Sequence, residues 1–149
     1  MTHAIQDIMQ HDHERLDKLL AETEIAVEKG HWQEAETLFQ GFRKGIVGAH
    51  MTIEEYLLFP AFERWSQDEQ HPLTALLRKG HQDLRVFFAE IEDSLQQHDT
   101  EEFADLLSTV QIILKQHDAK EESELYPYLD EALPGQGDFV RQKIAAAQE

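Results

Sequence analysis

Two stretches of this chain follow the same unusual pattern. One is HMTIEEYLLFP, from His50 to Pro60, and the other is HDAKEESELYP, from His117 to Pro127. Each consists of a histidine, three residues, two glutamates, three residues, an aromatic residue and a proline. The histidine and the first glutamate are spaced i, i+4, so on a helix both side chains leave the same face one turn apart. The pattern therefore predicts two helices that each present a His–Glu pair.

Glycine, proline and polar clusters divide the chain into pieces of helical length. No piece shows the strict alternation of a half-buried strand. We predict helices at about 2–29, 32–65, 72–98, 100–132 and 138–147. Short connections favour antiparallel neighbours, so the predicted fold class is all-α, an up-down-up-down four-helix bundle with a short extra C-terminal helix. The bundle domain is expected to span 1–135, followed by a helical extension at 136–149.

The second predicted helix contains unusual residues for a helix interior. Gly41, Gly45 and Gly48 each cost roughly 1 kcal/mol relative to alanine. Close approach of a neighbouring helix and local bending before His50 both explain them, and the sequence does not decide between the two. Pro60 is expected to kink the helix because it removes one backbone donor.

Helical-wheel positions place ionisable groups on the apolar stripes of the predicted helices. Six residues lie on or beside these stripes: His13, His50, Glu54, His81, His117 and Glu121. His11 instead points away from the stripe of the first helix. The remaining histidines lie at helix ends or breaks and are predicted at the surface: His3, His31, His71 and His98. Burying ionisable groups without partners is costly, so the six inward residues require an explanation.

Each half of the chain supplies a single histidine followed by a His-x3-Glu pair. Two halves related by a pseudo-twofold axis would gather four imidazoles and two carboxylates in one place. Such donors suit Fe, Mn, Co or Zn better than Ca or Mg. Two metals fit this set, each with two imidazoles from its own half and with the carboxylates as bridges. A structural His–Glu hydrogen bond in each copy is the alternative, but it does not account for two further inward histidines at matched positions.

Charge and composition exclude several classes of partner and site. The net charge of −17 argues against binding to nucleic acid or to anionic membranes, since both would repel the chain. The absence of cysteine excludes disulfides, thiolate metal sites and thiol catalysis, so nitrogen and oxygen must hold any metal. No apolar run approaches the roughly 20 residues of a membrane span, and the first residues do not match a signal peptide. We therefore expect a cytoplasmic protein.

Four stretches carry a resemblance to a known family: DHERL around His13, HMTIEEYLLFP, GHQDLRVFF around His81, and HDAKEESELYP. Over roughly residues 5 to 130 they resemble the hemerythrin family, specifically its HHE cation-binding branch. The resemblance implies a non-haem di-iron centre in a four-helix bundle, with O2, NO or iron itself as the ligand. Matched residue by residue, it implies these metal ligands, with the two glutamates as bridges: His13, His50, Glu54, His81, His117 and Glu121.

The chain departs from the oxygen-carrying members of that family. They have H-x3-H on the third helix, where this chain has Arg85 in the second position. They also usually close with a histidine and an aspartate one residue further apart, where this chain has Glu121. The five-histidine centre is therefore absent, and we expect both irons to keep an open position and the protein to be a poor reversible oxygen carrier. Arg85 is predicted to reach toward the bundle surface.

The remaining set resembles relatives linked to iron sensing and nitrosative-stress repair, although the repair proteins carry a cysteine-containing N-terminal region. Glu55 and Glu122 follow the predicted bridges and are either outer or solvated carboxylates or extra terminal ligands. Four aromatic residues are either redox-active neighbours of the metals or ordinary core and rim residues: Trp32, Tyr56, Trp65 and Tyr126.

The leading hypothesis is a small protein with two Fe ions, or Mn or Zn, that binds or senses O2, NO or peroxide or holds iron. A ferritin-like oxidase is less favoured because its Glu-x-x-His spacing occurs only at Glu28–His31, across Gly30 at a helix end. A metal-free helical interaction module is the third candidate. No second group of residues faces a substrate, so turnover of an organic substrate is not expected.

Overall fold

The computed structural model describes residues 4–148, and within that range every regular element is a helix. The first predicted helix is α1 (Ile5–Glu28), and the chain turns directly after it at Gly30. Gly30 has a φ of +73°, a left-handed conformation that glycine adopts without steric cost. The predicted start of this helix at Thr2, and His3, lie outside the described residues. The predicted all-α class is confirmed.

The second predicted helix is a continuous helical segment that contains two π-helical turns. Its parts are α2 (Trp32–Gly45), η1 (Ile46–His50), α3 (Met51–Ile53), η2 (Glu54–Leu58) and α4 (Phe59–Ser66). Pro60 lies in the first turn of α4, directly after η2, where a missing backbone donor is tolerated. The residue spacing alone does not predict π-helical turns, which occur often at functional sites.

The second half of the chain repeats this arrangement with one π-helical turn. It comprises α5 (Pro72–Gln96), α6 (Thr100–Lys120), η3 (Glu121–Leu125), the 3-10 turn η4 (Tyr126–Tyr128), α7 (Leu129–Ala132) and α8 (Gly137–Ala146). Asp99 caps α6, where its Oδ1 accepts the Glu102 N–H at 3.0 Å. The short final helix, α8, begins one residue before its predicted start at 138.

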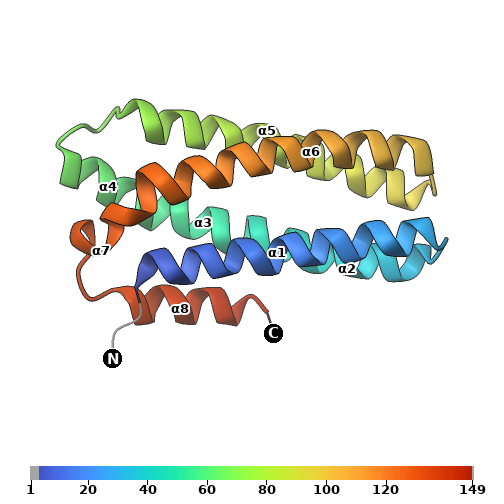
Figure 1. Ribbon diagram of the computed structural model, residues 1–149, viewed down its shortest axis with the longest axis horizontal. Coiled ribbons are helices and arrows are strands. Elements are labelled where there is room, and N and C mark those ends of the chain that lie inside the picture. The colour runs from blue at the N-terminus through green and yellow to red at the C-terminus, as the bar shows by residue number, and fades with distance from the viewer. Residues whose placement is uncertain (1–3, 149) are drawn as a thin grey trace.

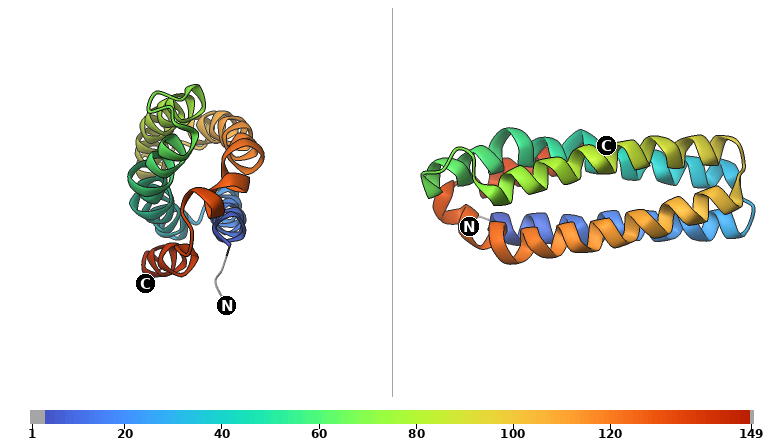
Figure 2. Two further views of the ribbon diagram at one scale, coloured as in Figure 1. Left: turned by 90° about the vertical axis from the view of Figure 1, so that its left-hand side faces the viewer. Right: turned by 90° about the horizontal axis from the view of Figure 1, so that it is seen from above.

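The long helical segments lie side by side along a common axis, and the end-on view shows them around one shared interior (Figures 1 and 2). The short helix α8 packs beside α1. Two apolar clusters fill the interior, one containing Leu16, Leu84 and Leu114 and the other containing Met9 and Leu77. The helices pass from one cluster to the other, and the predicted ligands occupy the stretch in between.

Gly45 is needed for the contact between α1 and α2. A Cβ atom at this position would lie 2.9 Å from Leu16 Cδ2 and 2.9 Å from Arg15 Nη2. Nothing lies within 4 Å of the same position at Gly41. Of the two explanations for the glycines, close helix approach therefore applies to Gly45 and not to Gly41.

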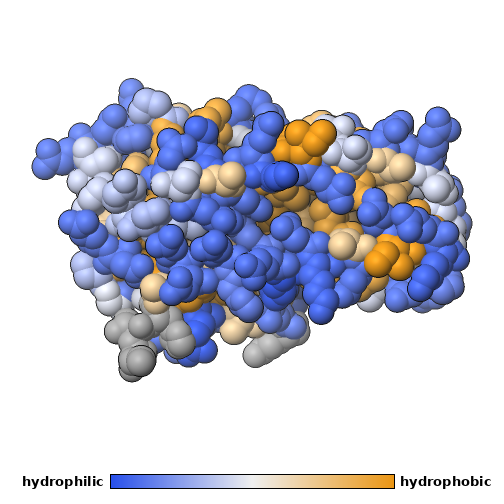
Figure 3. Space-filling model, viewed as in Figure 1, coloured by the Kyte–Doolittle hydropathy of each residue, from blue (hydrophilic) through white to orange (hydrophobic). Residues whose placement is uncertain are grey.

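Hydrophilic residues cover most of the face seen in Figure 1, and apolar residues show along the seam between α1 and α6 (Figure 3). Among residues 4–148, no helix has the length and apolar character that crossing a bilayer requires.

Candidate metal centre

The structure brings all six predicted ligands into one buried cluster. Their donor atoms form two groups, and within each group all atoms lie within 4.8 Å of one another. The first donor group consists of His13, His50, Glu54 and Glu121. The second donor group consists of Glu54, His81, His117 and Glu121. Glu54 and Glu121 belong to both groups, as expected of bridging carboxylates.

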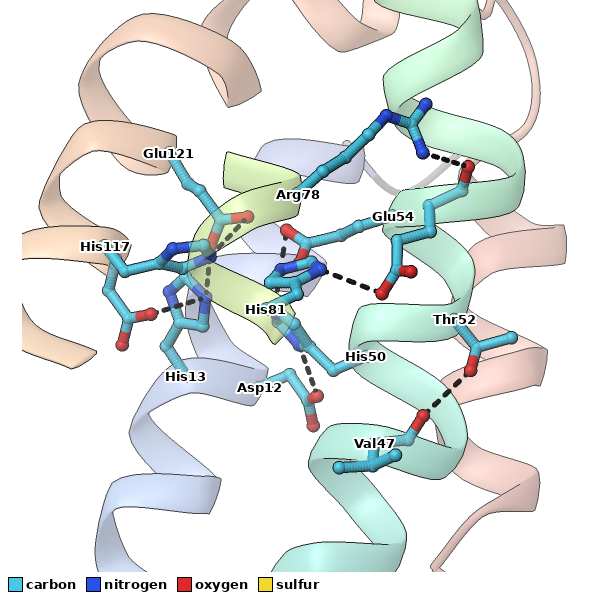
Figure 4. A network of polar contacts seen from close by, with 12 residues as sticks. Asp12, His13, Val47, His50, Thr52, Glu54, Arg78, His81, His117 and Glu121 are labelled. Atoms are coloured by element: carbon cyan, nitrogen blue, oxygen red, sulfur yellow. Dashed lines mark hydrogen bonds and ion pairs between the residues drawn. The ribbon is translucent and has the colours of Figure 1, made fainter. Parts of the chain in front are cut away.

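The two glutamates each direct one oxygen toward each group (Figure 4). In the first donor group, Glu121 Oε1 lies 3.3 Å from His13 Nε2, and Glu54 Oε2 lies 3.7 Å from His50 Nε2. In the second, Glu54 Oε1 lies 3.2 Å from His81 Nε2, and Glu121 Oε2 lies 3.4 Å from His117 Nε2. This arrangement matches the pseudo-twofold repeat of the sequence.

π-helical turns position three of these side chains. His50 ends η1, Glu54 begins η2 and Glu121 begins η3. A π-helical turn carries one more residue than an α-helical turn, so it shifts the direction of the side chains that follow. The Thr52 hydroxyl donates to the Val47 carbonyl at 2.8 Å and satisfies an acceptor in this irregular stretch (Figure 4).

Outer carboxylates orient three of the four imidazoles. The Nδ1 contacts are His13 to Glu122 Oε2 at 2.8 Å, His50 to Asp12 Oδ2 at 2.8 Å and His81 to Glu55 Oε2 at 2.9 Å. When the Nδ1–H of a neutral imidazole donates a hydrogen bond to a carboxylate, the lone pair of Nε2 remains available to bind a metal. In each case Nε2 faces the shared glutamates.

Two of the three outer carboxylates are themselves held by arginines. Arg15 Nε donates to Asp12 Oδ1 at 2.9 Å, and Arg85 Nη2 donates to Glu55 Oε2 at 2.6 Å. Burial raises the pKa of Glu55, but Arg85 and His81 outweigh it and lower the pKa below its usual value. Arg85 is half-buried and contacts this outer carboxylate instead of the donor groups, in line with the predicted direction toward the surface. The contact also favours the outer role for Glu55 over that of a terminal ligand.

His117 is held differently from the other three histidines. None of the described carboxylates lies within 4 Å of its Nδ1. The ring instead lies against Gly80, where an added Cβ atom would stand 2.9 Å from Nδ1. Gly80 directly precedes His81, just as Asp12 directly precedes His13. The position that supplies an outer carboxylate in the first half of the chain is therefore a glycine, without a side chain, in the second half.

Burial and neighbouring charges favour the protonated forms of Glu54 and His13. Burial raises the pKa of Glu54, and the neighbouring Glu121 raises it further. Burial lowers the pKa of His13, but Glu121, Asp118 and Glu54 outweigh this effect and raise it to about 10. Binding of two cations would release such protons, because metal ligands must be deprotonated.

Asp118 is a further, half-buried carboxylate beside the first donor group. Its Oδ1 lies 3.3 Å from His13 Nε2, and burial raises its pKa to about 7. Neither Asp118 nor Asp12 was among the predicted site residues. Asp12 interrupts the apolar stripe between Met9 and Leu16, a helical-wheel position that identifies it as an inward residue.

The Tyr126 side chain is completely buried, and its hydroxyl lies inside the first donor group. The hydroxyl donates to Glu54 Oε2 at 2.7 Å and lies 3.2 Å from Glu121 Oε1. It also lies 3.1 Å from His13 Nε2 and 3.2 Å from His50 Nε2. Of the four aromatic residues considered from the sequence, Tyr126 is therefore a member of the site.

Among residues 4–148, three buried side-chain atoms lack a hydrogen-bond partner, and all belong to the second donor group: His81 Nε2, His117 Nε2 and Glu121 Oε2. Buried polar atoms without partners are costly, and a cation would satisfy all three at once. Imidazole nitrogens and carboxylate oxygens are also the donors that iron, manganese and zinc accept. The residues present thus fit a bound metal.

A small cavity of about 10 Å³ lies within the cluster, close to the space of a single water molecule. A groove of about 590 Å³ runs over the outside, between α1 and α6. Four residues line both spaces: His13, Asp17, Leu114 and Asp118. The groove therefore gives small species an approach to the buried residues.

A family model described as "Hemerythrin HHE cation binding domain" matches residues 4–129 of the chain. No curated protein and no solved structure matched the sequence. The matched range includes both donor groups and the outer carboxylates, and it ends at the first residue of α7.

Proposed function

Because the chain belongs to the hemerythrin HHE cation-binding domain family, we propose that it functions through two metal ions held in the bundle interior. The observation that carries this proposal is the pair of donor groups that share Glu54 and Glu121. His13 and His50 would hold one metal, His81 and His117 the other, and the two glutamates would bridge them. The three unpartnered donor atoms of the second group support the assignment.

Iron is the metal we propose, with manganese and zinc as alternatives that the same donors accept. Bound iron would supply one-electron redox chemistry and coordination positions for small ligands. The chain itself orients three of the four imidazoles through outer carboxylates and surrounds all four with apolar side chains. This surrounding shell limits the access of water and tunes the metal.

The partner of the centre is proposed to be a diatomic ligand or peroxide, or iron as cargo. The cavity of about 10 Å³ has no room for an organic substrate. The groove between α1 and α6 supplies a route for species of that size. Sensing or binding of O2, NO or peroxide, or storage of iron, therefore fits better than turnover of an organic molecule.

The predicted up-down-up-down order of four helical segments is part of this proposal. It is supported by the short connections at Gly30 and Asp99 and by the side-by-side placement of the segments. We also retain the bundle domain at 1–135 with a helical extension at 136–149. The end of the family match at residue 129 is compatible with that division.

Total metal analysis of protein produced with iron, combined with an optical spectrum, tests the proposal. Two iron ions per chain with a non-haem iron spectrum are expected. Protein that folds stably and binds no iron, manganese or zinc would exclude a metal function and leave a helical interaction module.

A further inference from the structure

The aromatic residue of each repeated motif packs on the single histidine of the other half. The rings of Phe59 and His81 have centroids 5.5 Å apart and an interplanar angle of 26°. The rings of Tyr126 and His13 have centroids 5.6 Å apart and an angle of 33°. The two pairs are thus equivalent in place and orientation, and they differ by the hydroxyl group of Tyr126.

That hydroxyl has the surroundings of a donor atom in a metal's coordination shell. Its distances to the four donor atoms of the first group range from 2.7 to 3.2 Å. With metal–ligand bonds of about 2.0–2.2 Å, neighbouring donors at right angles lie roughly 3 Å apart. A fifth ligand beside four others would therefore stand where the Tyr126 hydroxyl stands.

We propose that the Tyr126 oxygen is a fifth protein ligand of the metal in the first donor group, bound as a phenolate. This inference rests on the proposed function, because it requires a metal at His13 and His50. On binding, the O–H bond of Tyr126 breaks, the oxygen keeps the electron pair and forms the bond to the metal, and the proton leaves to solvent. No electron is transferred in this step.

A cation at the first donor group would neutralise Glu54 and Glu121, which surround the Tyr126 hydroxyl, and would favour the phenolate. Phenolate formation would thus report occupancy of this half of the site.

In the described part of the chain, the residue of the second donor group that is equivalent to Tyr126 cannot serve as such a ligand. That residue is Phe59, which offers no donor atom, and three of the group's own donor atoms are unpartnered. The two donor groups therefore differ in their number of protein ligands. The sequence alone, in contrast, predicts an open position on both metals. A metal in the first donor group would be enclosed by protein ligands, and a metal in the second would keep a position for an external ligand.

Iron-loaded wild-type protein is compared with Tyr126→Phe, which removes only the hydroxyl, and with Tyr128→Phe as a control at an exposed tyrosine. Metal content, visible absorption and resonance Raman spectra are measured on each. Wild type and Tyr128→Phe should bind two irons and show a phenolate-to-Fe(III) charge-transfer band with tyrosinate vibrations. Tyr126→Phe should lose the charge-transfer band and the tyrosinate vibrations, and its circular dichroism spectrum should be unchanged. Titration with Zn²⁺ should give the ultraviolet difference spectrum of one tyrosinate in wild type and none in Tyr126→Phe.

Two irons without a tyrosinate signal in wild type would overturn the ligand role of Tyr126 and leave the proposed function standing. One iron per chain, without a tyrosinate signal, would show that the tyrosine blocks the first donor group, and it would also overturn the inference. Absence of any bound metal would overturn both proposals. A charge-transfer band that survives in Tyr126→Phe would assign it to another residue and contradict the inference.

Discussion

Glu122 Oε2 accepts a hydrogen bond of 2.8 Å from His13 Nδ1 and so ties η3 to α1 beside the first donor group. Loss of such an outer partner typically lowers metal affinity 10–100-fold, because the ring loses its orientation and its basicity. Glu122→Ala is expected to show a loss of this size in competition with a chelator. Glu124→Ala is the control, since Glu124 is exposed and its ion pair is with Lys120, away from the donor groups. Equal affinities of the two variants would argue against an outer role for Glu122.

Removal of a donor histidine should reduce both metal content and stability. His117→Ala deletes one donor of the second group and leaves Glu121, which is fully buried, with one fewer partner. Lost metal and a poorly paired buried carboxylate both destabilise the fold. Metal analysis and thermal unfolding measure the two effects. His11→Ala is the control, because the His11 side chain is exposed, and a His117→Ala protein that behaves like it would exclude this ligand.

The two shared glutamates should be equally important for metal binding. Glu54 and Glu121 each belong to both donor groups, so removal of either one weakens both metal positions. Glu54→Ala and Glu121→Ala are therefore expected to bind well below two metals per chain, to similar extents. Metal analysis after equilibration with excess iron checks this. If one variant keeps two metals while the other loses both, the glutamates are not equivalent bridges.

The inward or outward direction of the histidines could be predicted from the sequence, because the helical period and the repeat of the two halves agree. The helical positions of His13 and His81 beside apolar stripes place them inward, and both side chains are buried. Wheel arithmetic also turns His11 outward, and this residue is exposed. These predictions rest on the 3.6-residue period alone, which survives small changes of helix geometry.

Features that depend on the exact backbone path could not be predicted in this way. The π-helical turns at His50, Glu54 and Glu121 have no signature in the spacing of the repeat. The close contact between Gly80 and His117 depends on the distance between two helices, which no local pattern encodes. Tyr126 was recognised only as an aromatic residue, because the position of its hydroxyl follows from η3 and η4 together.

Gly80→Ala should disturb the second donor group, because the added Cβ atom would lie 2.9 Å from His117 Nδ1. Either the ring or the helix must shift, and overpacking of this kind costs roughly 1–3 kcal/mol. Weaker metal binding and a lower midpoint of unfolding are expected, as measured by chelator competition and denaturant titration.

Gly41→Ala is the matched control, since nothing lies within 4 Å of its added Cβ atom. It should be neutral or stabilise the helix by up to about 1 kcal/mol. Equal stability and equal metal affinity of the Gly80→Ala and wild-type proteins would show that His117 is not held against α5.

The metal-free protein should lose stability as the pH rises from about 6.5 to about 10. Burial lowers the pKa of His13, but Glu121, Asp118 and Glu54 raise it from 6.5 to about 10. A group with a raised pKa in the folded state binds more protons when folded. Its stabilising contribution is therefore complete below pH 6.5 and is lost as the pH passes through 10.

Thermal unfolding of metal-free protein across this pH range measures the effect, and the midpoint should fall steadily. His13→Gln should make the dependence shallower, because one of the three imidazoles with a raised pKa, those of His13, His50 and His117, is gone. His11→Ala should retain the full dependence. In the metal-loaded protein the cations take the place of the protons, so the midpoint should change less over the same range. A midpoint of the metal-free wild type that stays constant or rises between these pH values would contradict the protonated state of His13 in the empty site.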